Sequence, residues 1–103
     1  MNVDFIKERI TNLRLLKGVS EYKMSYDLGH SRGYINNISS GKTLPSMTEF
    51  LAICDYFEIT PAEFFDPGIN DPQRASEYKN DFGALKDKDQ ELISELVRRL
   101  RDK

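Results

Sequence analysis

The residues best equipped for chemistry lie in one short stretch, Leu28 to Pro45, with the sequence LGHSRGYINNISSGKTLP. Its polar residues include Arg32, Asn36 and Asn37, whose guanidinium and amide groups can each make paired hydrogen bonds to a planar partner. Such side chains suit the reading of base edges in a nucleic acid, and they equally suit a solvated helix surface. The surrounding elements must decide between these two interpretations.

Catalytic and metal-binding chemistry has little support elsewhere in the chain. There is one histidine, His30, and one cysteine, Cys54, and neither has a neighbouring partner in the sequence. No nucleophile has an identifiable base, no glycine-rich phosphate loop follows a strand, and no metal-ligand spacing is present. We therefore expect no enzyme, no cofactor and no metal site. We expect His30 to be a turn residue and Cys54 to pack in the core.

Length and charge set further limits. A chain of 103 residues predicts one domain with an appended helix. The net charge is −2, with 7 basic and 8 acidic residues up to position 65 and 8 and 9 beyond it. Because neither part is basic, binding to nucleic acid would depend on the local placement of cations. The lack of a long apolar run, of a signal-peptide pattern and of a cysteine pair predicts a cytoplasmic protein.

The elements that must position the polar stretch begin with two helical patterns. The first has apolar residues at spacings of four, three and three, and ends at Gly18. Ser20 is expected to cap a second, short helix that runs through Leu28, and Gly29 to follow it in a left-handed conformation. The apolar positions of these two helices are Ile6, Ile10, Leu13, Leu16, Met24 and Leu28.

A third helix is expected after the turn at Gly29. Ser31 is the predicted cap of this helix, and Ile35 and Ile38 are its inward residues. Ser25, four residues before the glycine, is the small residue that two crossing helices need. The sequence therefore predicts two short helices joined by a tight turn.

Two further helices follow a loop. Ser46 is the expected cap of the fourth, and Thr60, Pro61 and Glu63 begin the fifth with a capping box. The fourth has the broad apolar face of a central buried helix, and two phenylalanines of the fifth are expected to close over the core. These apolar residues are Met47, Phe50, Leu51, Ile53, Cys54, Phe57, Phe64 and Phe65.

The C-terminal third differs from the rest. Residues 67–83 contain turn formers and few apolar anchors, which predicts a linker or loosely packed segment. From Asp87 an amphipathic helix is expected, and its acidic start and basic end suit the helix dipole. The predicted architecture is all-α, with five compact helices and one detached helix. The apolar side of the last helix consists of Leu92, Ile93, Leu96, Val97 and Leu100.

From about Ile6 to Phe65, the chain resembles the lambda-repressor/Cro-like helix-turn-helix family of XRE type. The resemblance rests on RITNLRLLKGVS, LGHSRGYINNISSGKTLPS and FLAICDYFEITPAEFF, which place helices, caps and glycines in the family's order. It implies that residues 1–66 form a five-helix lambda-repressor-like DNA-binding domain. Residues 67–83 would then be the linker, and residues 84–103 a C-terminal helix that is a candidate dimerisation element.

In this family the second helix of the motif lies in the major groove of DNA, with its N-terminal residues at base edges. The resemblance implies base-reading roles for Arg32, Gly33, Asn36 and Asn37. It implies contacts to the DNA backbone for Ser20, Ser31, Ser40, Lys42 and Thr43.

The chain departs from the family pattern at three positions. Glu21 stands where the family usually has glutamine, and a carboxylate cannot donate a hydrogen bond to phosphate. Ser39 stands where the family often has a glutamate that pairs with an arginine at the position of Arg14. Without that pair, Arg14 must find another partner or face water. His30 replaces a residue that is usually apolar.

Two functions from different classes follow from these observations. The first is a sequence-specific DNA-binding transcriptional regulator, a repressor that acts as a homodimer on a roughly palindromic operator in double-stranded DNA. The second is a protein-interaction module, such as the antitoxin component of a toxin–antitoxin pair, to which the acidic balance and Glu21 are suited. The C-terminal helix either folds back onto the first domain or pairs with a partner.

Overall fold

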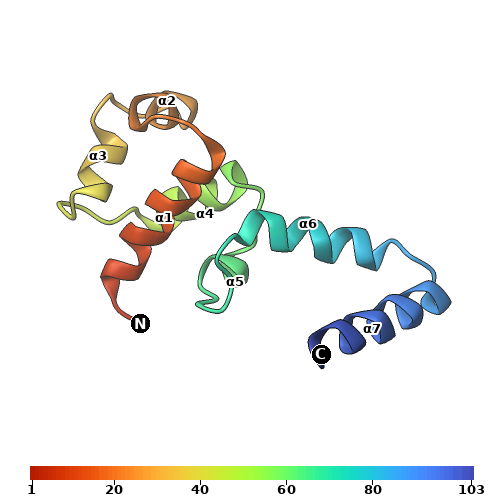
Figure 1. Ribbon diagram of the computed structural model, residues 1–103. Coiled ribbons are helices and arrows are strands. Elements are labelled where there is room, and N and C mark those ends of the chain that lie inside the picture. Colours follow the sequence, from red (N-terminus) through yellow and green to blue (C-terminus); the bar gives the residue numbers. More distant parts are fainter.

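The computed structural model describes residues 1–103, which form helices joined by turns and loops, without a strand. Figure 1 shows α1 to α5 gathered in one body, with α6 and α7 extending away from it. The expected all-α fold is confirmed, with seven helices where the sequence predicts six. The helices are α1 (Val3–Lys17), α2 (Glu21–Asp27), α3 (Tyr34–Ser39), α4 (Met47–Tyr56), α5 (Pro61–Phe64), α6 (Pro72–Gly83) and α7 (Asp87–Arg101).

Local signals set the ends of most helices where the sequence predicts them. α1 ends at Gly18, whose φ of 75° is the left-handed conformation that glycine adopts without strain. The side chain of Ser20 accepts a hydrogen bond from the backbone three residues later and so begins α2. Ser46 and Thr60 each form a capping box with the glutamate three residues later, at the starts of α4 and α5.

The cap predicted at Ser31 is wrong. Residues 32 and 33 form a turn, and α3 begins at Tyr34 with Gly33 at the cap position and no side chain capping it. The backbone carbonyl of Ser31 accepts from the N–H of Tyr34 at 3.0 Å, which closes that turn before the helix begins. Arg32 and Gly33 therefore precede α3 and do not lie on it.

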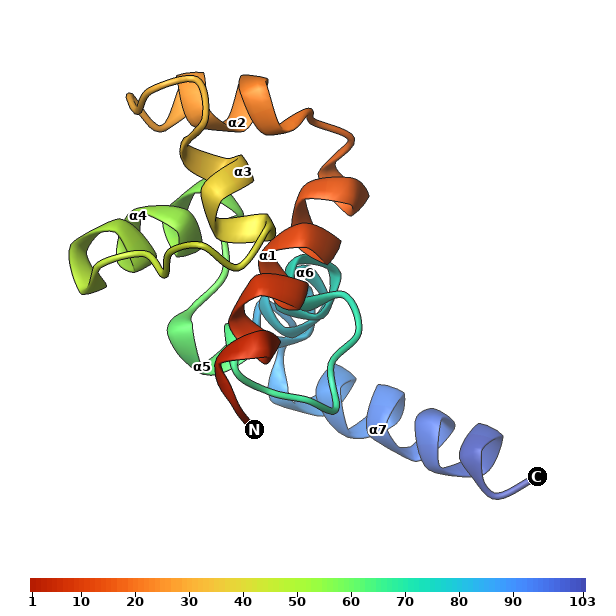
Figure 2. The ribbon, with the colours of Figure 1, turned by 90° about the vertical axis from the view of Figure 1, so that its left-hand side faces the viewer.

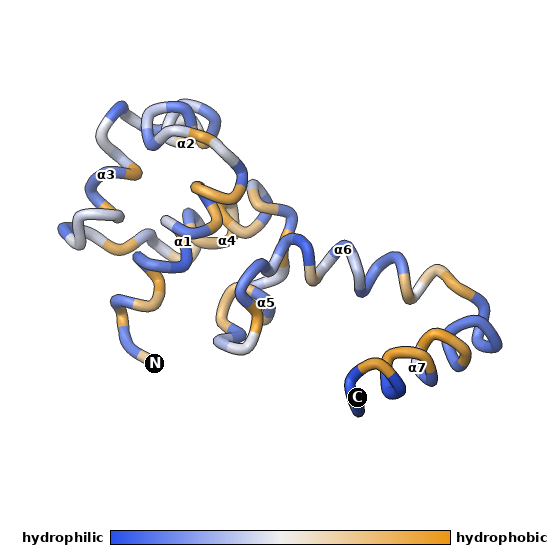
Figure 3. The backbone as a smooth tube through the Cα atoms, viewed as in Figure 1, coloured by the Kyte–Doolittle hydropathy of each residue, from blue (hydrophilic) through white to orange (hydrophobic).

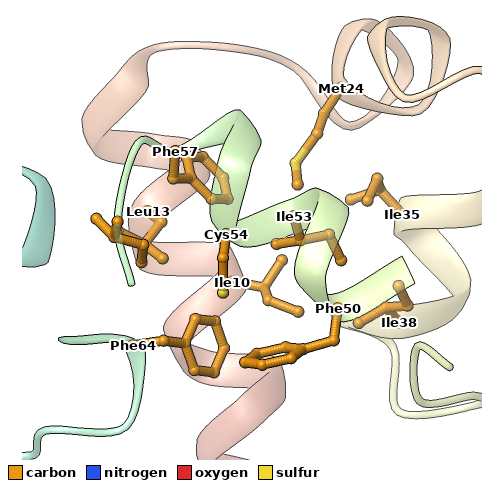
Figure 4. Packing of buried hydrophobic residues seen from close by; sticks show 11 residues of the cluster. Ile10, Leu13, Met24, Ile35, Ile38, Phe50, Ile53, Cys54, Phe57 and Phe64 are labelled. Atoms are coloured by element: carbon orange, nitrogen blue, oxygen red, sulfur yellow. The ribbon is translucent and has the colours of Figure 1, made fainter. Parts of the chain in front are cut away.

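One apolar core holds the α1–α5 body together. Figure 4 shows its side chains pointing toward one another from α1, α2, α3, α4 and the chain around α5. Three residues predicted to face inward are exposed instead: Leu16 is 58% exposed, Met47 73% and Leu51 50%. For α4 the reason is its position at the edge of the body, with one side open (Figure 2). The core residues are Ile10, Leu13, Met24, Ile35, Ile38, Phe50, Ile53, Cys54, Phe57, Ile59 and Phe64.

Arg9 of α1 binds the chain that leaves α5. Its side chain is only 6% exposed, and its guanidinium donates to three backbone carbonyls. The acceptors are those of Phe64 at 2.9 Å, Asp66 at 2.6 Å and Ile69 at 2.6 Å. Burial lowers the pKa of Arg9, and the nearby Asp66 carboxylate opposes that shift. These bonds fasten the segment between α5 and α6 to the first helix.

The segment 67–83, predicted as a linker or loosely packed, contains a helix. Asp71 accepts a hydrogen bond from the N–H of Arg74 and caps α6, and Pro72 occupies its first turn. These two residues begin a helix as readily as they form a turn. Pro72 is the only residue of α6 that is buried, and the few apolar residues of this helix form too short a stripe for a sequence pattern to predict it.

The last helix, α7, lies away from the α1–α5 body, so it does not fold back onto the first domain (Figure 1). The radius of gyration is 16.7 Å, whereas a compact chain of this length has about 13 Å. Figure 3 shows α7 with hydrophobic residues alternating with hydrophilic ones along its turns. No residue of α7 is buried. None of the helices combines the length and the apolar content that crossing a membrane requires.

Candidate nucleic-acid interface

The turn between α2 and α3 is built by Gly29. Its φ of 74° is left-handed, as expected, and its N–H donates to the carbonyl of Tyr26 at 2.9 Å. The next N–H, of His30, donates to the carbonyl of Ser25 at 3.0 Å. These two bonds end α2 and redirect the chain toward α3 within a few residues.

A buried hydroxyl joins the two helices of this motif. Ser25 is 0% exposed, and its Oγ donates to the carbonyl of Glu21 at 2.8 Å. The same oxygen accepts from the N–H of Ile35 in the first turn of α3, at 3.1 Å. A small residue was expected here, and the structure adds a hydrogen bond that satisfies an otherwise unpaired donor of α3. Ile35 and Ile38 are buried as predicted and hold α3 against the core.

The four candidate base-reading residues are all exposed, in two groups. Asn36 and Asn37 lie on the outer side of α3, whereas Arg32 and Gly33 form the turn before it. The guanidinium of Arg32 lies over the ring of Tyr22 on α2, at 5.6 Å from the ring centre. Such a cation–π contact orients the arginine while leaving its donors free. Gly33 has open space where a side chain would start, so it presents bare backbone.

The candidate DNA-backbone residues at the end of α3 follow a second left-handed glycine. Gly41 has φ 81°, and the N–H groups of Lys42 and Thr43 both donate to the carbonyl of Asn37, at 2.9 and 3.1 Å. The segment thus wraps tightly around the helix end. The side chains of Ser40, Lys42 and Thr43 are exposed there, close to the outer side of α3.

The other two candidate backbone residues lie on either side of α2. The hydroxyl oxygen of Ser20 caps this helix, which leaves its hydrogen available to a phosphate. Ser31 is exposed in the turn before α3. These residues are therefore on the same helix-turn-helix unit as the others, one before α2 and one in the turn before α3.

Glu21 has a role that sequence reasoning missed. Its carboxylate accepts a hydrogen bond from the hydroxyl of Ser39 and another, at 3.4 Å, from the amide of Asn36. These contacts lower the pKa of Glu21, the Ser39 bond most strongly and the Asn36 bond and the Arg14 charge to a lesser degree. The acidic side chain is therefore bound by α3. The signal that could have revealed it was that both Glu21 and Ser39 depart from the family pattern.

Arg14 finds a different partner from the one the family pattern implies. Its Nη1 donates to the carbonyl of Val19 at 2.8 Å, within the turn that joins α1 to α2. A carboxylate still lies close enough to interact with it, but that carboxylate is Glu21 on α2 and not a residue of α3. The two departures at positions 21 and 39 thus move the carboxylate near Arg14 from α3, where the family pattern has it, to α2.

His30 is a packing residue of the turn. Its ring stacks on Tyr34, with 3.8 Å between ring centres and 9° between planes. Its Nε2 lies 3.9 Å from the Oε2 of Glu49. Burial raises the pKa of Tyr34 to about 12, and the Glu49 charge adds to this. No group of three or more potential metal ligands gathers anywhere in the chain.

The electrostatics of this surface are modest. Lys23 on α2 forms an exposed ion pair with Asp27 at 2.8 Å, so a carboxylate accompanies its charge. Arg32 and Lys42 have no acidic partner and stand near opposite ends of α3. The arrangement can make hydrogen bonds to bases between two cations that attract phosphates.

Comparison with known proteins places this motif in a defined class. Residues 9–67, which are more than half of the chain, match the family described as the Cro/C1-type HTH DNA-binding domain. The match covers most of α1 and all of α2, α3, α4 and α5. No curated protein and no solved structure matches the chain significantly.

Proposed function

Because the chain belongs to the Cro/C1-type helix-turn-helix DNA-binding family, we propose that it is a sequence-specific transcriptional regulator. Its mode of action is repression, in which a dimer occupies a roughly palindromic operator and excludes other proteins from the promoter. The family favours DNA binding over the protein-interaction module that the acidic balance suggested.

The observation that carries this proposal is the polar outer side of α3 on a rigid support. Asn36 and Asn37 are exposed, while Ile35 and Ile38 of the same helix are buried in the core. An asparagine amide fits the N6 and N7 edge of adenine, and the guanidinium of Arg32 fits guanine. Because Ser25 fixes the start of α3, these groups would reach the major groove in a defined orientation.

Contacts to the DNA backbone come from the ends of the motif. Lys42 supplies a cation, and the hydroxyls of Ser20, Ser31, Ser40 and Thr43 are exposed donors. With few cations near α3, namely Arg32, Lys42 and the Lys7 that lines a hollow beside Lys42, the non-specific component of binding will be small. The regulator therefore depends more on base contacts, and its affinity falls less steeply with salt than that of a basic protein.

A dimer supplies the specificity that one domain lacks. A single α3 of six residues reaches a few base pairs, which is too little information for a unique site in a genome. Two domains on two half-sites about one helical turn apart double the number of bases read.

Selection from random DNA duplexes with the full chain at low salt tests this function. We expect an enriched palindrome, and we expect Arg32→Ala to relax the preference at one base pair per half-site by about 1–3 kcal/mol. Arg32→Lys should relax it too, because an ammonium keeps the charge but loses the paired donors. Enrichment of no sequence would refute the proposal.

A second pair of variants separates phosphate contacts from base contacts. Lys42→Ala should weaken binding to all duplexes and reduce the salt slope by about one. Lys79→Ala, an exposed lysine on α6, is the matched control and should leave both unchanged. If the two variants behave alike, Lys42 does not contact DNA.

A further inference from the structure

The apolar side of α7 has no partner within the chain. Its members are between 39% and 64% exposed. Three of them, Leu92, Ile93 and Leu96, line a shallow hollow of about 330 Å³ together with two charged residues. Contiguous apolar surface on a helix without buried residues marks a site of interaction. These residues are Leu92, Ile93, Leu96, Val97 and Leu100.

The charges of α7 are separated between its two ends. Its first five residues carry three carboxylates and one lysine, and its last four carry three arginines and no acid. Two of these arginines also lie close to the carboxylates of Glu95 and Asp102. A second copy of α7 placed parallel would set carboxylates beside carboxylates and guanidiniums beside guanidiniums. Placed antiparallel, it would set each acidic end beside a basic end.

Asp89 makes this difference sharper, because it lies on the apolar side itself. It precedes Leu92 by three residues and Ile93 by four, which are the spacings that share a helix face. In a parallel pair, Asp89 would face Asp89 of the other copy across an apolar contact. In an antiparallel pair, it would face the basic end of the other helix instead.

We propose that α7 pairs with α7 of a second copy of this chain in antiparallel orientation, around a two-fold axis near Leu96. This inference rests on the dimer of the proposed function and specifies how the dimer is made. Leu92 then lies opposite Leu100 of the other copy, since they are equally distant from Leu96. The same surface serves both copies, as a two-fold interface requires.

Disulfide formation between single-cysteine substitutions in the full chain tests the orientation. Leu92→Cys and Leu100→Cys replace exposed side chains, and the native Cys54 is 1% exposed and stays out of reach. In the antiparallel pair, two cysteines at position 92 are about 12 Å apart along the axis, too far for a disulfide. A mixture of the two variants should therefore cross-link under oxidation, while each variant alone should not.

A cysteine on the other face of α7 is the control for this cross-linking. Glu91→Cys, on the opposite face, should not cross-link in any mixture. If Leu92→Cys or Leu100→Cys cross-links efficiently with itself, the pair is parallel and the inference is wrong. If sedimentation shows the unmodified full chain to be a monomer at tens of micromolar, the inference is wrong as well.

Asp89→Asn is an independent test, because it should change the dimer dissociation constant in opposite directions for the two orientations. For the antiparallel pair, losing two symmetric ion contacts should raise the dimer dissociation constant about two- to tenfold at low salt. A parallel pair would be strengthened, because two facing carboxylates would be removed. An unchanged or lowered dissociation constant would overturn the proposal.

The two proposals fail separately. A chain that pairs through α7 and enriches no DNA sequence would refute the regulator and leave the pairing intact. A chain that enriches a DNA sequence and sediments as a monomer would refute the pairing, and with it the preformed dimer, and leave sequence-specific DNA recognition intact.

Discussion

Replacing Arg9 with alanine removes three hydrogen bonds that join α1 to the chain after α5. The carbonyl of Phe64 loses its partner in a buried setting, whereas those of Asp66 and Ile69 lie nearer the surface and can take up water. An orphaned buried carbonyl costs about 1–3 kcal/mol, and each of the other two bonds contributes about 1 kcal/mol. We therefore expect Arg9→Ala to lower the free energy of unfolding by about 3–5 kcal/mol.

That change is a large fraction of the stability of a small domain, which is about 5–15 kcal/mol in total. For a domain of this size the midpoint of thermal unfolding should fall by at least about 12 °C. Arg9→Lys should lose about half as much, because one ammonium cannot reach three carbonyls in a fork. Urea unfolding followed by circular dichroism measures all three proteins under the same conditions.

Glu8→Ala is the matched control, since Glu8 is the neighbouring exposed residue of α1. It should change the free energy of unfolding by no more than about 0.5 kcal/mol. Amide exchange adds a second readout, in which Arg9→Ala should expose the first turn of α6 before the α1–α5 body. A loss below 1 kcal/mol for Arg9→Ala, or equal stability of the lysine variant and the unmodified protein, would refute this account.

Three further perturbations test other parts of the fold. Ser25→Ala leaves the buried N–H of Ile35 without an acceptor and should cost about 1–3 kcal/mol in urea unfolding; a cost near zero would show that the hydroxyl does not join the helices. The folded-state pKa of Glu21 is depressed, so its stabilisation is present above the unfolded value of 4.5 and is lost as pH falls through the folded pKa. Glu21→Gln should therefore remove part of the acid-induced loss of stability, and identical pH profiles would contradict this. Burial raises the pKa of Cys54 to about 11, so a thiol reagent at pH 8 should react with it only after unfolding, and rapid reaction of the folded protein would be the contrary result.

Elements with strictly local causes could be predicted from the sequence. The caps at Ser20, Ser46 and Thr60 and the left-handed Gly29 depend on residues no more than a few positions away, and the structure confirms them. The cap at Ser31 failed on the same local scale. There the backbone closed a turn first and left the helix to begin at Tyr34.

Features that depend on distant partners could not be predicted. Arg9 donates hydrogen bonds to carbonyls that lie 55 or more positions away in the chain. An arginine within an amphipathic helix gives no sequence signal for such distant partners. Glu21 meets Ser39 only because α2 and α3 cross, so the carboxylate that seemed to oppose phosphate binding is used inside the protein. In the candidate interface, the family pattern indicated which residues would face DNA, and the structure shows the contacts that hold their helices in place.

The helical state of α6 has a consequence for how the two ends of this protein can evolve. A flexible linker could gain or lose residues without consequence, because it does not fix the orientation of the two parts that it joins. The 12 residues of α6 instead span about 18 Å with a fixed rise and rotation per residue. Inserting one residue turns α7 by about 100° around the α6 axis, whereas inserting seven returns it to within about 20° of its direction. Lengths that differ by whole turns should therefore be tolerated, and single insertions should not.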